Sequence, residues 1–133
     1  MALVMAVDGK QDALAYAINA LAPENLVLRL FVNDIEPAAA DTEADYDEVT
    51  DGGYVPALLD GPDWDYPTDA APSVAVYPTQ TFTFEGAVPA IYGYFYTRET
   101  SGRLFAAERF DDGPYVVPAE GGVLRVTPRL TAD

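Results

Sequence analysis

The chain contains no cysteine and no histidine, and its 133 residues include only one lysine and two serines. Without cysteine it can form neither disulfides nor thiolate metal sites. Without histidine it lacks the usual general base and the commonest metal ligand. Ser–His and Cys–His catalysis and histidine-based zinc sites are therefore excluded, and carboxylate chemistry is the main enzymatic route left open.

Long apolar runs are also missing. No run approaches the roughly 20 residues that a helix needs to cross a bilayer. The apolar stretch from Met1 to Val7 lacks a basic region and is too short for a signal peptide. We expect a soluble protein that is made in the cytoplasm, with no membrane partner.

Basic residues are scarce. The net charge is −15, and no lysine or arginine lies between Arg29 and Arg98, an interval that holds thirteen acidic residues. Such a surface repels phosphate and anionic lipid, so we expect no nucleic-acid partner. The acidity suits solubility and salt tolerance, and it also suits a protein that must stay unbound beside packaged DNA.

The composition predicts one domain over residues 1–133. Half of the residues are apolar and 12% are aromatic, and a chain of this length can bury a sizeable core. Residues 1–23 form a predicted N-terminal arm and helix, with Asp8 as N-cap of a helix from about Lys10 to Leu21 that Pro23 ends. The spacing of one buried stripe is followed by Ala13, Leu14, Ala17, Ile18 and Leu21.

Short strands punctuated by glycine, proline and aspartate follow the helix. Even spacing of such strands is typical of a sandwich or jelly roll. The predicted fold class is mainly β: an antiparallel, jelly-roll-like β-sandwich with a short N-terminal helix and a long acidic, proline-rich excursion over residues 36–72. The strands are predicted at 26–33, 74–77 continuing through 79–84, 91–98, 104–110, 115–117 and 123–129.

The strand at 91–98 is apolar on both faces. Alternation places Tyr92, Tyr94 and Tyr96 on one face and a core-like set around Phe95 on the other. Tyrosine favours places where one end is dry and the other meets water or a partner. Either a second sheet covers the tyrosine row, or another protein does, and we predict an interface there.

Two acidic regions could carry chemistry. Six carboxylates lie between Asp41 and Asp51, and oxygen ligands are what Ca²⁺ requires, but their order is not that of a helix-loop-helix calcium loop. Asp63 and Asp65 flank Trp64 and resemble a glycosidase pair or a sugar platform only in composition. A solvated acidic face is the plainer interpretation, so we assign no catalytic residue, no cofactor and no metal.

Two further predictions concern contacts. The excursion over 36–72 is longer than an ordinary loop, and loops of that size are functional or flexible. It should contain one or two short strands anchored by Tyr54, Leu58 and Trp64, and Trp64 is a further candidate interface residue. Glu108 and Arg109, between phenylalanines, are predicted to form a structural ion pair or an inter-subunit contact.

Several segments, in order, resemble a family of small virion proteins of tailed bacteriophages and prophages. After the short helix they are LVLRLFVNDIEP, ADTEADYDEV followed by GGYVPALL, a tryptophan beside Asp63, a strand from Tyr77 to Phe84 ending in TFTF, and IYGYFYTRETSGRLFAAERF before a VTPRL tail. The resemblance covers nearly the whole chain. Its most specific block is IYGYF followed by an SG turn and AERF.

The resemblance implies a virion structural protein, not an enzyme. Its leading version is a capsid decoration (cement) protein with a jelly-roll-like sandwich, which assembles as a homotrimer on the capsid exterior and binds the major capsid protein. The alternative is a tail or neck component, or a glycan-binding appendage of the phage particle. The family offers no catalytic motif to transfer.

Overall fold

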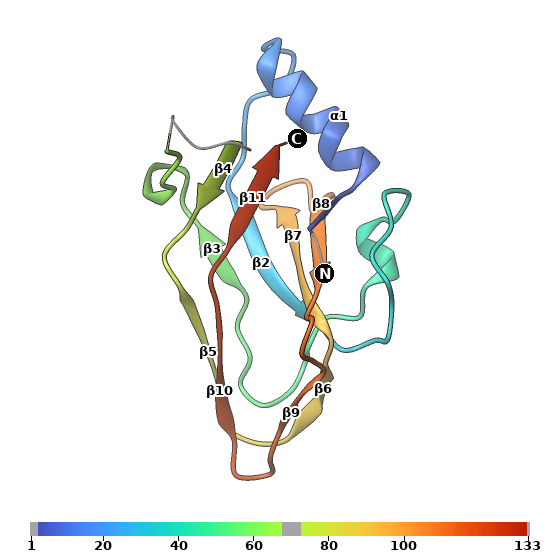
Figure 1. Cartoon of the computed structure of the whole chain (residues 1–133), viewed down its shortest axis with the longest axis vertical. Coiled ribbons are helices and arrows are strands. Elements are labelled where there is room, and N and C mark those ends of the chain that lie inside the picture. The colour runs from blue at the N-terminus through green and yellow to red at the C-terminus, as the bar shows by residue number, and fades with distance from the viewer. Residues whose placement is uncertain (1–2, 68–72, 133) are drawn as a thin grey trace.

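The structure is a computed structural model that describes residues 3–67 and 73–132, and its main sheet has five antiparallel strands (Figure 1). The strands lie in the order β1-β8-β7-β2-β3. At the centre, β7 pairs with β2 from Leu26 opposite Arg98 to Phe31 opposite Gly93. The five strands are β1 (Val4–Met5), β2 (Leu26–Phe31), β3 (Ala57–Leu59), β7 (Gly93–Arg98) and β8 (Leu104–Arg109).

The second half of the chain continues the β7·β8 pair as one long antiparallel hairpin. Its tip is formed by residues 99–103, and its arms stay paired out to Ser73 opposite Ala132, with register shifts in the β7·β8 and β6·β9 pairs. Three two-stranded ribbons follow one another along the arms: β6·β9, β5·β10 and β4·β11. Their strands are β4 (Ser73–Val76), β5 (Gln80–Phe84), β6 (Val88–Ile91), β9 (Tyr115–Val117), β10 (Gly122–Val126) and β11 (Arg129–Ala132).

The long hairpin folds back on itself between β6·β9 and β5·β10. Residues 85–87 and 118–121 make the bend, which Figure 1 places at the end of the molecule opposite helix α1 (Val7–Ala17). The β5·β10 and β4·β11 ribbons then run back along the five-stranded sheet. The prediction of a mainly β fold with antiparallel strands and one short N-terminal helix is confirmed.

The apolar core lies between the sheet and the returning ribbons. Leu28, Leu30 and Tyr96 from the sheet are buried in one cluster with Phe82 and Val126 from the ribbons. Strands β2 and β7 are also buried on their other face. There, a second cluster contains Ala6, Phe31, Tyr46, Phe95, Leu104 and Ala107.

The tyrosine row of β7 belongs to the main core. Tyr94 and Tyr96 are 5% and 0% exposed, and burial is the main cause that raises the pKa of each above that of free tyrosine. Tyr92 is partly buried, with the Arg109 guanidinium 5.0 Å from its ring centre. The predicted interface is therefore wrong at Tyr94 and Tyr96, because the returning ribbons cover them; the alternative of a strand buried on both faces is confirmed.

Helix α1 packs on β8 with a face that its apolar periodicity does not predict. The helix begins at Val7 with Ala6 as N-cap, not Asp8, and it ends at Ala17. Leu14 and Ile18 of the predicted buried stripe are 67% and 75% exposed. Among the described residues, no helix is long and apolar enough to span a membrane.

The orientation of α1 is set by Gly9 and Asp12, the two buried residues of the helix. A Cβ added at Gly9 would lie 2.1 Å from the Phe105 carbonyl oxygen, so only glycine allows so close an approach. Asp12, one turn later, forms an ion pair at 3.2 Å with Arg98. Backbone contact and charge therefore override the apolar stripe.

Residues 36–67 contain β3 and two 3-10 helices, η1 (Glu43–Asp45) and η2 (Gly61–Asp63). Tyr54 anchors this segment as predicted, since its hydroxyl donates to Glu48 at 2.7 Å and accepts from the Leu30 amide at 3.1 Å. The anchor predicted at Leu58 is wrong by one residue: Leu58 is exposed and Leu59 is buried. Residues 68–72 of the predicted excursion lie outside the described residues.

Replacing Gly9 by alanine is expected to lower the free energy of unfolding by about 2 kcal/mol, because the new Cβ would overlap the Phe105 carbonyl. In an unhindered helix interior the same change would stabilise by up to about 1 kcal/mol. Chemical denaturation followed by circular dichroism measures the difference. Gly61→Ala is the control, since its Cβ would meet only the Asn25 Oδ1 atom, at 3.6 Å. A more stable Gly9→Ala protein would contradict this packing.

Tyr94→Asp is expected to destabilise the fold by more than about 3 kcal/mol, because it removes a buried ring and places a carboxylate in the core. Tyr94→Phe should cost only about 1 kcal/mol, because it loses only the hydroxyl's hydrogen bond, which reaches Glu108 at 3.0 Å. Thermal unfolding of both variants tests the assignment. If Tyr94→Asp kept the stability of the parent chain, the ring could not lie in the core.

Candidate binding groove

The structure separates the residues that the sequence marks as an interface. Glu108 and Arg109 do not pair with each other: Glu108 accepts the Tyr94 hydrogen bond, and Arg109 forms ion pairs with Asp34 at 2.5 Å and Glu36 at 3.6 Å. The predicted ion pair between Glu108 and Arg109 is therefore wrong, because the carboxylates that pair with Arg109 lie in the segment after β2. Of the six candidates, Trp64 lines an open hollow.

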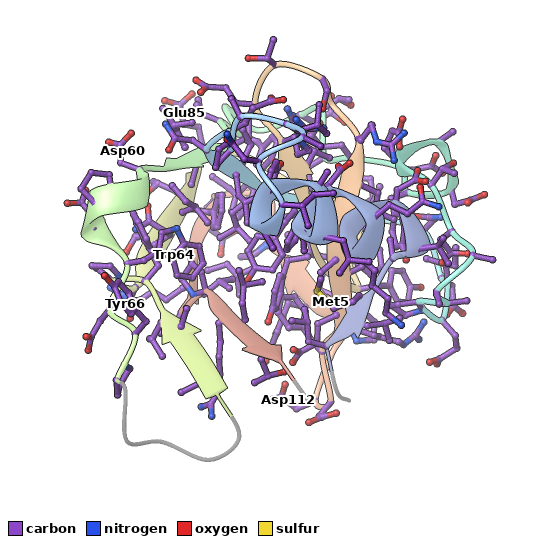
Figure 2. All side chains as sticks on the ribbon, turned by 90° about the horizontal axis from the view of Figure 1, so that it is seen from above. Met5, Asp60, Trp64, Tyr66, Glu85 and Asp112 are labelled. Carbon is purple, nitrogen blue, oxygen red and sulfur yellow. The ribbon has the colours of Figure 1, made fainter. Side chains whose placement is uncertain are left out.

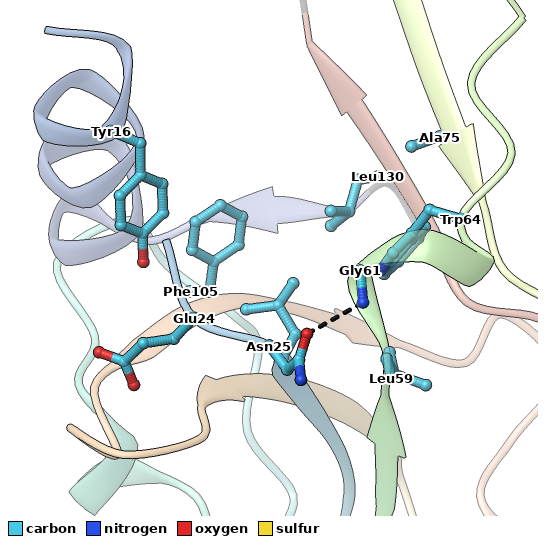
Figure 3. A pocket seen from close by; sticks show the side chains of 10 residues that line it. Tyr16, Glu24, Asn25, Leu59, Gly61, Trp64, Ala75, Phe105 and Leu130 are labelled. Atoms are coloured by element: carbon cyan, nitrogen blue, oxygen red, sulfur yellow. Dashed lines mark hydrogen bonds between the residues drawn. The ribbon is translucent and has the colours of Figure 1, made fainter. Parts of the chain in front are cut away.

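That hollow belongs to an apolar groove at the end of the molecule where α1 lies (Figures 2 and 3). Two adjoining hollows of about 240 and 330 Å³ share Ala75, Phe105 and Leu130. Figure 2 shows Trp64 and Tyr66 on one side and Met5 on the other. The smaller hollow is lined by Tyr16, Glu24, Asn25, Leu26, Leu59, Gly61 and Trp64 besides the shared residues; the larger is lined by Met5, Ala13, Tyr66, Val74 and Thr131.

Phe105, in the floor of the groove, owes its position to an irregularity in β8. Tyr96 is opposite Ala106 and Thr97 is opposite Leu104, so Phe105 is an extra residue with no partner on β7. Such a bulge re-aims a side chain. Figure 3 shows the Phe105 ring between Tyr16 of α1 and Leu130 of β11.

The helical wall of the groove is held by a buried arginine. Arg98, which is 5% exposed, forms ion pairs with Asp12 of α1 and with Glu24 before β2. Its guanidinium also lies 5.4 Å from the centre of the Tyr16 ring. Arg103, beyond the hairpin tip, adds ion pairs to Asp8 at 3.3 Å and to Asp12 at 3.5 Å.

Both polar side chains that reach the smaller hollow from residues 24 and 25 are already bonded within the chain. Asn25 Oδ1 accepts from the Gly61 amide at 2.9 Å, the dashed line in Figure 3. Glu24 accepts from the Thr100 and Ser101 amides at 2.6 and 3.1 Å. Partial desolvation raises the pKa of Glu24, but these amides and the Arg98 charge outweigh it and lower the pKa below its usual value.

The carboxylates between Asp41 and Asp51 are also used inside the fold. Asp41 accepts from the Tyr46 hydroxyl at 2.8 Å, Asp45 caps η1 through the Thr42 amide, and Glu48 binds Arg29 at 3.0 Å. No group of three or more carboxylates within residues 3–67 and 73–132 is arranged to hold a metal ion. Asp41, Asp45 and Glu48 of this acidic stretch therefore serve as internal hydrogen-bond acceptors.

The groove is suited to bind an apolar group. Most of its lining is apolar, and the polar side chains of Glu24 and Asn25 are engaged with the backbone. Open apolar hollows of this kind are typical of binding sites for apolar side chains or small molecules. The arrangement offers burial rather than acid–base chemistry.

Sequence reasoning found Trp64 but missed Phe105 and Leu130, which join the two hollows. A bulge leaves little trace in a pattern of alternating residues, and Leu130 lies in the VTPRL tail, far from Trp64 along the chain. One local signal of the Phe105 position is present in the sequence. A glycine inside an otherwise helical pattern, as at Gly9, indicates that another part of the chain packs closely against the helix there.

Glu24→Gln is expected to reduce stability near neutral pH and to have progressively less effect as the pH falls. The folded-state pKa of Glu24 is lowered, so its contribution is present above the unfolded-state pKa and is lost as the pH falls through the folded-state value. Urea unfolding over a pH series measures the gap between parent and variant. Glu120→Gln, an exposed carboxylate before β10, is the control. A gap independent of pH would contradict the assigned role.

Comparison of the chain with models of known protein families, with curated proteins and with solved structures finds no match. The groove and the sequence are therefore the basis on which a function can be proposed.

Proposed function

We propose that this chain is a structural protein of a tailed-bacteriophage particle, a capsid decoration protein that stabilises the shell by non-covalent contacts with the major capsid protein. The observation that carries the proposal is the apolar groove, in which Glu24 and Asn25 are already bonded within the chain. Such a surface favours docking of another protein over catalysis. A partner that binds only the assembled shell stabilises it by mass action.

The fold supports this role through its topology. A long hairpin that folds back over the sheet is the arrangement from which jelly-roll sandwiches are built, and we propose that this chain is a small member of that class. Several chemical features fit as well. The sequence has no histidine or cysteine, and its net charge of −15 keeps it from binding packaged nucleic acid.

The exposed apolar face of α1 extends the proposed docking region. Leu14 and Ile18 face away from β8, and residues 13–23 contain no charged side chain, in a chain with 22 acidic residues. An uncharged apolar face on an acidic protein is suited to contact with another protein. We propose that this face meets neighbouring copies in a homotrimer on the capsid exterior.

The copy number of the chain in purified virions, measured by quantitative mass spectrometry against the major capsid protein, tests the proposal. We expect a number comparable to that of the major capsid protein. A handful of copies would place the chain in the tail or neck, and absence from the particle would refute a virion role.

Tyr66→Asp is expected to reduce binding of the chain to particles that lack it by about tenfold or more, because it removes an aromatic ring from the lining of the larger hollow. Tyr66 is 70% exposed, so the fold should survive the change, as circular dichroism would verify. Val116→Asp is the matched control, since Val116 is 75% exposed on β9, outside the groove. Equal occupancy for the two variants would rule out docking through the groove.

A further inference from the structure

The two hollows of the groove define how much apolar material it can take. They measure about 240 and 330 Å³ and meet at Ala75, Phe105 and Leu130. Each is large enough for one large apolar side chain, and their common wall places the two side chains next to each other. In an extended segment, residues i and i+2 point to the same side and are neighbours, so a segment with two apolar residues at that spacing matches the groove.

The charge around the groove is strongly one-sided at the end formed by Trp64. Asp60, Asp63 and Asp65 are all exposed along the segment that carries Trp64. Asp60 is further tied to the groove through Asn25, whose side-chain amide donates to it at 3.4 Å. No basic residue occurs between Arg29 and Arg98 to offset these carboxylates locally.

The basic side chains near the groove leave this acidic end unbalanced. Arg98 is buried and paired with Asp12 and Glu24. Arg129 lies opposite Val76, which also pairs with Asp65, and residues directly opposite each other share one face of a sheet. Arg129 and Asp65 therefore both point away from the face on which Ala75 and Leu130 lie. Lys10 lies at the other end, in a hollow that shares Met5 and Thr131 with the larger one.

We infer that the groove binds a partner segment that carries two apolar side chains flanked by lysine or arginine at the Trp64 end. The inference rests on the proposed function, since it names the partner chemistry of the same groove. The apolar pair fills the two hollows, and the basic residue meets Asp60 and Asp63, which lie beside Asn25 and beside Tyr77, the ring that Trp64 contacts. Opposite charges across such a rim select the partner and its orientation, whereas like charges repel it.

Two synthetic pentapeptides test the charge rule on the full chain. Both are acetylated and amidated, with leucine at the second and fourth positions and alanine between them. One has lysine at each end, so that either chain direction places a lysine at the Trp64 end; the other has glutamate at each end. Heteronuclear NMR titration should show the lysine peptide shifting the amide signals of Ala75, Phe105 and Leu130, and the glutamate peptide binding about tenfold more weakly.

The double variant Asp60→Asn/Asp63→Asn separates the effect of charge from the effect of fit. It should weaken the lysine peptide several-fold and leave unchanged the binding of a third peptide with glutamine at each end. Both substituted side chains are exposed, and asparagine keeps an acceptor for Asn25, so folding should persist. Glu120→Gln, which removes an exposed carboxylate outside the groove, should change nothing.

The inference is overturned if the glutamate peptide binds as tightly as the lysine peptide, or if the shifted signals lie outside the groove. These failures differ from failure of the proposed function. Absence of the chain from virions would refute the virion role while leaving the peptide preference intact. Loss of particle binding in Tyr66→Asp, with no preference between the peptides, would retain groove docking and reject the charge rule.

Discussion

Arg98 is the charge at which three segments of the chain meet. It ends β7, and its ion pairs reach Asp12 on α1 and Glu24 ahead of β2. A buried guanidinium is costly unless it is paired and hydrogen-bonded, so the helix and the segment before β2 must stay where their carboxylates reach it. The position of α1, and with it one wall of the groove, follows from this constraint.

Other arginines are also paired with carboxylates of the chain, and this pairing determines which charges remain on the surface. Arg29, Arg98, Arg103 and Arg109 are all engaged by carboxylates within the chain. Most of the seven basic side chains therefore hold segments together, while most of the 22 acidic ones remain to face solvent. The acidic surfaces of two copies repel each other. Because the groove and the outer face of α1 are uncharged, contact with another molecule meets least repulsion there.

The sequence predicts where the helix and strands lie along the chain better than it predicts which face of each is buried. Regular alternation and turn residues located most of the strands, because these signals are local. The burial of Tyr94 and Tyr96 depended on whether a second layer covers β7, which pairing across the chain decides. The face of α1 was mispredicted because the Gly9 contact with Phe105 and the Asp12 pair with Arg98 outweigh an apolar stripe. The position of Phe105 was not predicted, because Phe105 is an extra residue in β8 and the bulge changes the direction of its side chain.

The order in which the long hairpin pairs during folding determines when the groove forms. Near the tip, Thr97 and Leu104 are close along the chain, whereas Ser73 and Ala132 pair across nearly half of it. Closing long loops costs more entropy than closing short ones, so a hairpin that zips from its tip joins β4 to β11 last. Ala75 and Leu130 lie on those two strands, and an incompletely zipped chain has no complete groove. If the chain has the function proposed above, only fully folded copies would present the docking surface to the particle.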